Sequence, residues 1–78
     1  MASPPVALSI AGSDCSAGAG IQADLKTFSL LGVHGLTAIS TVVAESPLEL
    51  HSCHHLSPQA LREQVLAVLD RYPVAAIK

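Results

Sequence analysis

The chain has few charged residues, few basic residues among them, and only two cysteines. Charged residues make up 13% of its 78 residues, whereas 50% are apolar. A composition so low in charge and so rich in apolar residues excludes a disordered chain. Four Lys and Arg against six Asp and Glu give a formal net charge of −2. The sequence therefore offers no electrostatic basis for binding nucleic acid or an anionic membrane.

Other absences narrow the class further. No apolar run reaches the roughly 18 residues needed to cross a bilayer. Met1 to Pro5 lack the basic segment of a secretory signal, so we expect a cytoplasmic location. Cys15 and Cys53 are too few for a disulfide scaffold, and we expect both to remain free thiols. There is no internal repeat, low-complexity stretch or domain linker.

Strand-like segments are what the sequence does contain in abundance. Short apolar runs and a β-branched run are typical of buried strands, and Glu45-Ser-Pro47 is placed to end one of them. The last run, Val74 to Lys78, has nothing after it to cover or pair it, so we expect the N-terminal piece of a larger protein. The predicted strands are residues 5–11, 35–44 and 74–78, with a shorter edge strand at 48–50.

Two predicted helices alternate with these strands. Apolar residues recur at helical spacing from Ile21 to Phe28, and Gly32 is placed to end that helix. The second helix begins at Ser57-Pro58, an N-cap followed by proline at the first helical position, and ends at Tyr72-Pro73. This order predicts an α/β fold that begins a doubly wound parallel sheet with a βαβ unit.

The glycine-rich loop at residues 12–20 lies between a strand and a helix, where ligands bind in open α/β sheets. A Walker A phosphate loop is excluded, because the chain has no Gly-Lys-Ser/Thr. A dinucleotide-binding oxidoreductase is an alternative, since Gly18 to Ala23 fits G-x-G-x-x-A and Glu45 ends the next strand. That fingerprint needs its first glycine directly after the strand, however, and six residues separate Ala11 from Gly18. A loop with glycines only to turn the corner is the third interpretation.

Residues 11–28, AGSDCSAGAGIQADLKTF, resemble the N-terminal signature of the hydroxymethylpyrimidine and phosphomethylpyrimidine kinases of thiamine synthesis. The similarity continues through 31–35 and 41–44. It implies a ribokinase-like fold in which residues 1–78 are the substrate-side portion of one kinase domain. ATP and Mg²⁺ would be bound mainly by a C-terminal portion outside this chain, and the complete protein would be a homo-oligomer.

The implied reaction moves the γ-phosphoryl group of ATP to 4-amino-5-hydroxymethyl-2-methylpyrimidine, to its monophosphate, or to both. In that family the base and the anion-holding turn lie in a Gly-Thr-Gly-Cys-type segment, which this chain lacks. We therefore expect no catalytic residue here and no activity from these 78 residues alone. Pyridoxal or pyridoxine kinases of the same fold are the nearest alternative.

The resemblance also implies five substrate-binding residues. Backbone at Gly12 and Ala19 would lie against the pyrimidine, with Val43 near the ring. Asp14 would hold the substrate or order the loop, unless it is an ordinary turn-forming residue. Glu45 stands where the family commonly has Gln. An ionised carboxylate only accepts hydrogen bonds, so Glu45 would be protonated, or pair with a protonated ring, or select another substrate, unless it merely ends a strand at the surface.

Four further features are open to functional interpretation. His51 to His55 contains three histidines and Cys53, but zinc sites usually need a second ligand pair, which is missing. We expect this segment to be an exposed flap over the pocket and not a metal site. Cys15 precedes a helix, where a thiolate is stabilised, but no base is assigned beside it. We expect Lys26 and Arg62 to be solvated surface residues.

Overall fold

A computed structural model describes residues 3–78, which form one four-stranded sheet and two helices. The strands lie in the order β3-β2-β1-β4. β1 pairs in parallel with β2 and with β4, and β3 is antiparallel to β2. The strands are β1 (Val6–Asp14), β2 (His34–Ser46), β3 (Glu49–His55) and β4 (Val74–Ile77).

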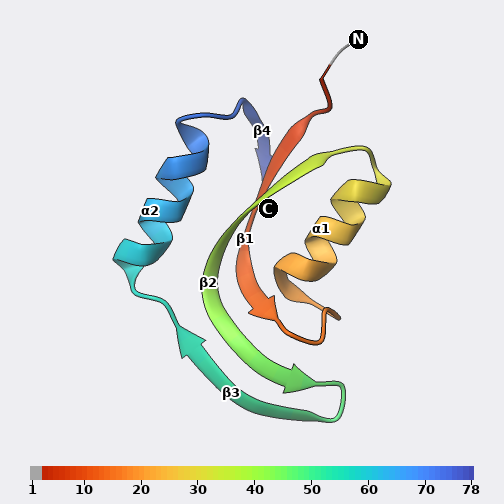
Figure 1. Ribbon diagram of the computed structural model, residues 1–78, viewed down its shortest axis with the longest axis vertical. Helices are drawn as coiled ribbons and strands as arrows, with labels where there is room; N and C mark the ends of the chain where they lie inside the picture. The colour runs from red at the N-terminus through yellow and green to blue at the C-terminus, as the bar shows by residue number, and fades with distance from the viewer. Residues whose placement is uncertain (1–2) are drawn as a thin grey trace.

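The helices are α1 (Gly20–Leu30) and α2 (Pro58–Leu69), and they lie on opposite sides of the sheet (Figure 1). The predicted α/β class and the start of a doubly wound sheet are confirmed. The start of α2 and the end of α1 follow local chemistry. The Ser57 side chain accepts from the Ala60 N–H, with Pro58 at the first helical position. Gly32, with φ of +72°, follows the end of α1.

Several predicted boundaries were wrong. β1 continues three residues past Ala11, and β2 continues through Glu45 to Ser46, so the predicted break at Glu45 begins two residues too early. The predicted short edge strand at 48–50 is a seven-residue strand, because it pairs with the extension of β2. α2 ends at Leu69 and not at Tyr72. β4 pairs with β1, which precedes it in the chain, along one edge.

The core lies where α1 covers β1 and β2. Leu8, Ser9 and Ala38 are fully buried, and Ile21 of α1 is also buried. An added Cβ at Gly35 would lie 2.7 Å from a Leu25 side-chain carbon, so α1 seats directly on β2. No helix among residues 3–78 has the length and apolar character needed to span a bilayer.

Candidate functional site

The loop after β1 is organised around the Asp14 carboxylate. This side chain accepts hydrogen bonds from the Ser16 N–H (2.8 Å), the Ser16 hydroxyl (2.7 Å) and the Ala19 N–H (2.9 Å). Asp14 is only 4% exposed. These bonds, led by the one from the Ser16 hydroxyl, hold the pKa of Asp14 below its usual value. An ionised Asp14 therefore bonds the backbone and hydroxyl of its own loop, as the turn-forming alternative describes, and its role toward a substrate stays a prediction.

Gly20 allows the loop to approach β1 closely. Gly20 begins α1 with φ of +63°, and a Cβ added there would collide with the Gly12 carbonyl oxygen. A Cβ at Gly12, in contrast, would lie 3.4 Å from the Thr41 carbonyl oxygen of β2, which is an ordinary contact distance. The turn therefore requires glycine at Gly20, whereas the contacts of Gly12 do not require one.

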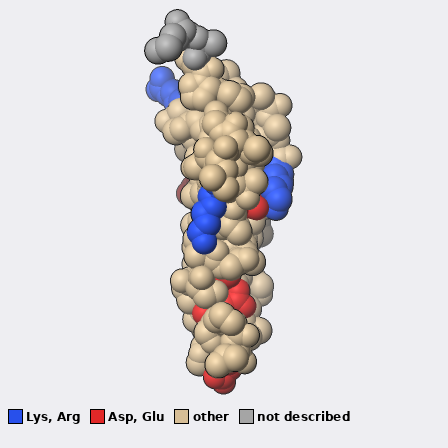
Figure 2. Space-filling view, turned by 90° about the vertical axis from the view of Figure 1, so that its right-hand side faces the viewer, with Lys and Arg blue, Asp and Glu red and all other residues tan. Residues whose placement is uncertain are grey.

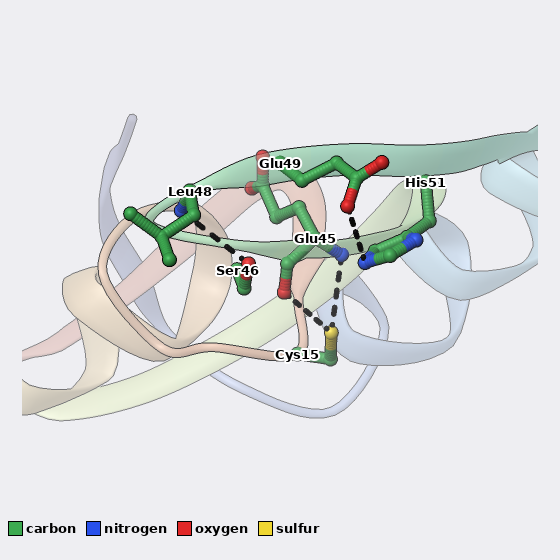
Figure 3. Close-up of polar contacts among 6 residues, drawn as sticks. All are labelled: Cys15, Glu45, Ser46, Leu48, Glu49 and His51. Atoms are coloured by element: carbon green, nitrogen blue, oxygen red, sulfur yellow. Dashed lines mark hydrogen bonds and ion pairs between the residues drawn. The ribbon is translucent and has the colours of Figure 1, made fainter.

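Glu45 lies at the carboxyl end of β2, half-buried, beside this loop. The Cys15 sulfur donates to the Glu45 carbonyl oxygen at 3.2 Å and accepts from its N–H at 3.3 Å (Figure 3). Burial, and then the charge of Asp14, raise the pKa of Glu45. The two carboxyl groups therefore share one end of the sheet.

Val43 completes this group, because it pairs with Asp14 in the β1–β2 ladder. The structure thus brings four of the five predicted site residues to the carboxyl ends of β1 and β2. The fifth, Ala19, lies next to them at the start of α1, but its N–H is taken by Asp14. The Ala19 N–H is therefore not free to donate a hydrogen bond to a ligand, and the backbone there can make only van der Waals contact with it. The predicted binding roles of all five remain predictions: Gly12, Asp14, Ala19, Val43 and Glu45.

The charge distribution supports this grouping. Most of the acidic atoms visible in the space-filling view lie in its lower half, whereas the Lys and Arg side chains visible there lie higher, with one acidic group beside them at mid-height (Figure 2). That lower end is where Figure 1 places the β2–β3 hairpin and the end of β1. An end of the sheet with this charge favours ligand groups that donate hydrogen bonds.

Two side chains of α1 join the site without having been predicted there. Gln22 accepts from the Asp14 N–H at 2.9 Å, and Lys26 donates to the Ala17 carbonyl oxygen at 3.0 Å. Lys26 is exposed, as predicted, and its hydrogen bond to the loop is a surface contact that the sequence did not predict. The available signal was the four-residue spacing of Gln22 and Lys26 on one helix stripe. An open groove of about 610 Å³ lies beside the middle and end of α1, and Lys26 is one of its lining residues.

The histidine segment is part of β3. The His55 ring nitrogen Nδ1 lies 2.9 Å from the Thr41 hydroxyl, and His51 lies 3.8 Å from a Glu49 oxygen. Within residues 3–78, His, Cys, Asp and Glu side chains form no group of three able to hold a metal ion. The segment from His51 to His55, predicted to be an exposed flap, is a strand paired with β2 and exposed along most of its length.

Gly18 lies closer to the end of β1 than the sequence predicted. Because β1 ends at Asp14 and not at Ala11, three residues separate the strand from Gly18 instead of six. The glycine still does not follow the strand directly, so the tight turn of that fingerprint is absent.

The chain is similar to known proteins in both sequence and structure. The family described as phosphomethylpyrimidine kinase matches residues 14–78. The hydroxymethylpyrimidine/phosphomethylpyrimidine kinase of Bacillus subtilis is 49% identical over 72 residues, which cover 92% of this chain and 27% of that protein. A putative kinase of the same name from Schizosaccharomyces pombe is 47% identical over 74 residues, or 95% of this chain and 13% of that protein.

Solved structures agree. The crystal structure of phosphomethylpyrimidine kinase from Clostridium difficile matches with a TM-score of 0.91 and 40% identity, covering 94% of this chain and 32% of that one. The ADP complex of Bacillus subtilis pyridoxal kinase matches with a TM-score of 0.87 and 43% identity, covering 96% and 29%. The chain spans about a quarter of the length of its Bacillus relative. It belongs to the phosphomethylpyrimidine kinase family and has the ribokinase-like fold of these vitamin kinases.

Proposed function

We propose that residues 1–78 form the substrate-side portion of an ATP-dependent kinase for 4-amino-5-hydroxymethyl-2-methylpyrimidine, its monophosphate, or both, in thiamine diphosphate biosynthesis. Family membership supports the reaction class. The observation that carries the assignment to this chain is the shared position of Asp14 and Glu45 at the carboxyl ends of neighbouring parallel strands. A cytoplasmic location and a homo-oligomer of the complete protein remain predictions.

The ring would lie against the backbone of Gly12 and Ala19, with Val43 at its side. The Asp14 carboxylate is already used to order the loop, which leaves Glu45 as the carboxyl group best placed to meet the ring. An ionised Glu45 accepts hydrogen bonds. A protonated aminopyrimidine presents two adjacent N–H donors, from its ring nitrogen and its amino group, and would match both carboxylate oxygens.

The chemistry would be attack of the hydroxymethyl oxygen on the γ-phosphorus of ATP, with the bond to ADP breaking and the hydroxyl proton passing to a base. Among residues 3–78 no group of three metal-ligating side chains is present, and the Asp14 carboxylate is committed to the loop. We propose that ATP, Mg²⁺ and the base all belong to the remaining part of the enzyme. This chain's residues would bind the alcohol and orient it.

A hybrid enzyme tests the proposal. The segment of the Bacillus subtilis kinase that matches this chain is replaced by the corresponding residues of this chain. We expect ATP-dependent phosphorylation of hydroxymethylpyrimidine by the hybrid, and none by the 78-residue chain alone. The unmodified Bacillus kinase is the positive control. A hybrid that folds by circular dichroism and binds ATP, but phosphorylates neither the pyrimidine nor its phosphate, would overturn the proposal.

A pyridoxal kinase is the second candidate. It is favoured by the match to a pyridoxal kinase structure at 43% identity and by a carboxyl group at Glu45, which could meet a pyridinium N–H. The same hybrid, assayed with pyridoxal and pyridoxine beside the pyrimidine, separates the two. Faster turnover of pyridoxal would favour this candidate, and its failure to react would exclude it.

A further inference from the structure

Two polar side chains on one side of α1 form hydrogen bonds to the loop that Asp14 orders. Gln22 and Lys26 are four residues apart and therefore lie one helical turn from each other on the same side of α1. The Gln22 amide accepts from the Asp14 N–H at 2.9 Å and donates to the Ser13 hydroxyl at 2.8 Å. Lys26 reaches the Ala17 carbonyl oxygen at 3.0 Å. The helix thus holds both the end of β1 and the middle of the loop.

Lys26 forms its hydrogen bond at a residue with a strained backbone, Ala17. Ala17 is the one non-glycine residue with positive φ among residues 3–78, at +63°. A non-glycine residue in this left-handed region is strained, so other contacts must maintain it. Two do so. The Ala17 N–H donates to the Asp14 carbonyl oxygen at 2.9 Å, and its carbonyl oxygen accepts from Lys26.

The loop backbone between these anchors leads directly to Ala19. Because the Ala19 N–H is bound by Asp14, the path from Ala17 to Ala19 is fixed at both ends. Any ligand resting on this backbone meets a surface whose position depends on the two α1 side chains.

We propose that Gln22 and Lys26 are positioning residues that hold the Asp14–Ala19 loop in the conformation that receives the substrate ring. This inference rests on the proposed function for its ligand, but the loop's dependence on the two side chains does not. Neither residue would touch the reacting atoms. Their loss should weaken binding of the ring and leave the transfer step itself nearly unchanged.

The first experiment needs no substrate. Hydrogen exchange of the Ser16, Ala17 and Ala19 amides is compared between the 78-residue chain, its Lys26→Met variant and its Gln22→Met variant. We expect about tenfold faster exchange at these amides in both variants, with β1 and β2 amides unchanged. Arg62→Met, on the exposed surface of α2, is the matched control and should change none of them. Unchanged loop exchange in both α1 variants would overturn the proposal, whatever the chain's substrate is.

The second experiment uses the hybrid enzyme. We expect Lys26→Met to raise KM for the pyrimidine about tenfold, the change that one hydrogen bond from a charged donor corresponds to, with kcat within about twofold. Lys26→Arg should restore KM, because it keeps a charged donor of similar length. A fall in kcat with KM unchanged would overturn the positioning role. An inactive parent hybrid would count against the proposed function only, since hydrogen exchange still decides the loop.

Discussion

Asp14 and Glu45 show how one local environment shifts two carboxyl groups in opposite directions. Hydrogen bonds from Ser16 lower the pKa of Asp14, whereas burial and the neighbouring Asp14 charge raise the pKa of Glu45. Asp14 therefore stabilises the folded state when it is ionised, and ionised Glu45 opposes folding. Ionised Glu45, which suits a cationic ligand, lowers the stability of the folded chain when no ligand is bound, as is common at functional sites.

Glu45→Gln should make the chain more stable near pH 7. A carboxyl whose folded pKa is raised carries no penalty below its ordinary value of 4.5, and the full penalty once pH exceeds the raised value. The melting temperature of the variant should therefore exceed that of the parent at pH 7, and the two should converge below about pH 4.

The matched control is Glu49→Gln, which removes the same charge from exposed β3 in the same hairpin. It should leave the melting temperature close to the parent at both pH values. A Glu45→Gln variant less stable than the parent at pH 7, or a difference that persists at pH 4, would contradict the raised pKa.

At the scale of elements, α2 completes the edge of β2 where β3 no longer reaches. The ladder between β2 and β3 starts at Thr41. Just before it, the Gln64 amide accepts from the Ile39 N–H at 2.8 Å and donates to the Ile39 carbonyl oxygen at 2.9 Å. A single side chain thus takes the place of a neighbouring strand and ties the helix to the sheet.

Gln64→Met should remove both hydrogen bonds between this side chain and the Ile39 backbone. It keeps side-chain length but leaves the Ile39 backbone groups without partners, which costs about 2 kcal/mol and lowers the melting temperature by about 10 °C. Gln59→Met is the control, because exposed Gln59 bonds only to Glu63 on the same helix. Equal melting temperatures for the two variants would show that solvent satisfies Ile39 instead.

The elements themselves followed from local sequence, but their lengths did not. The order of strands and helices was predictable from apolar spacing. Ser57-Pro58 indicated the start of α2, and Gly32 indicated the end of α1. The extension of β1 to Asp14 was not predictable, because Gly12 and Ser13 favour a loop locally, and the strand continues past an irregularity at Gly12 through the pairing of Ser13 and Asp14 with β2. The whole of β3 was underestimated for the same reason, since its polar sequence acquires strand structure by pairing with β2.

The candidate site was only partly predictable. The family resemblance supplied Gly12, Asp14 and Glu45, and the structure brings them together. Gln22 and Lys26 were missed because a polar stripe on a helix is usually solvated. Only the folded loop shows that it lies within their reach.

At the scale of the whole molecule, Asp24 links three elements. Its carboxylate accepts from the fully buried Ser9 hydroxyl of β1 at 2.6 Å and pairs with Lys78, just past β4, at 3.1 Å. The Ser9 hydroxyl first, and then Lys78, lower the pKa of Asp24. Ionised Asp24 therefore stabilises the folded chain above its ordinary pKa of 3.8, and that contribution disappears as pH falls through the lowered value.

Asp24→Asn should lower the melting temperature at pH 7 by about 5 °C, or about 1 kcal/mol, because the amide keeps a contact with Ser9 but loses the charge. The difference should shrink as the pH is lowered below 3.8. Asp70→Asn, at the exposed end of α2, should leave the melting temperature unchanged or slightly higher. A variant as stable as the parent at pH 7 would remove Asp24 from this role.

The central position of β1 affects the order in which the sheet can form. Val6 faces His34 on one side and Val74 on the other, so β1 can pair with β2 before residues 74–77 have been synthesised. Until β4 pairs with it, the other edge of β1 presents unpaired backbone N–H and C=O groups, with which a strand of another chain can pair.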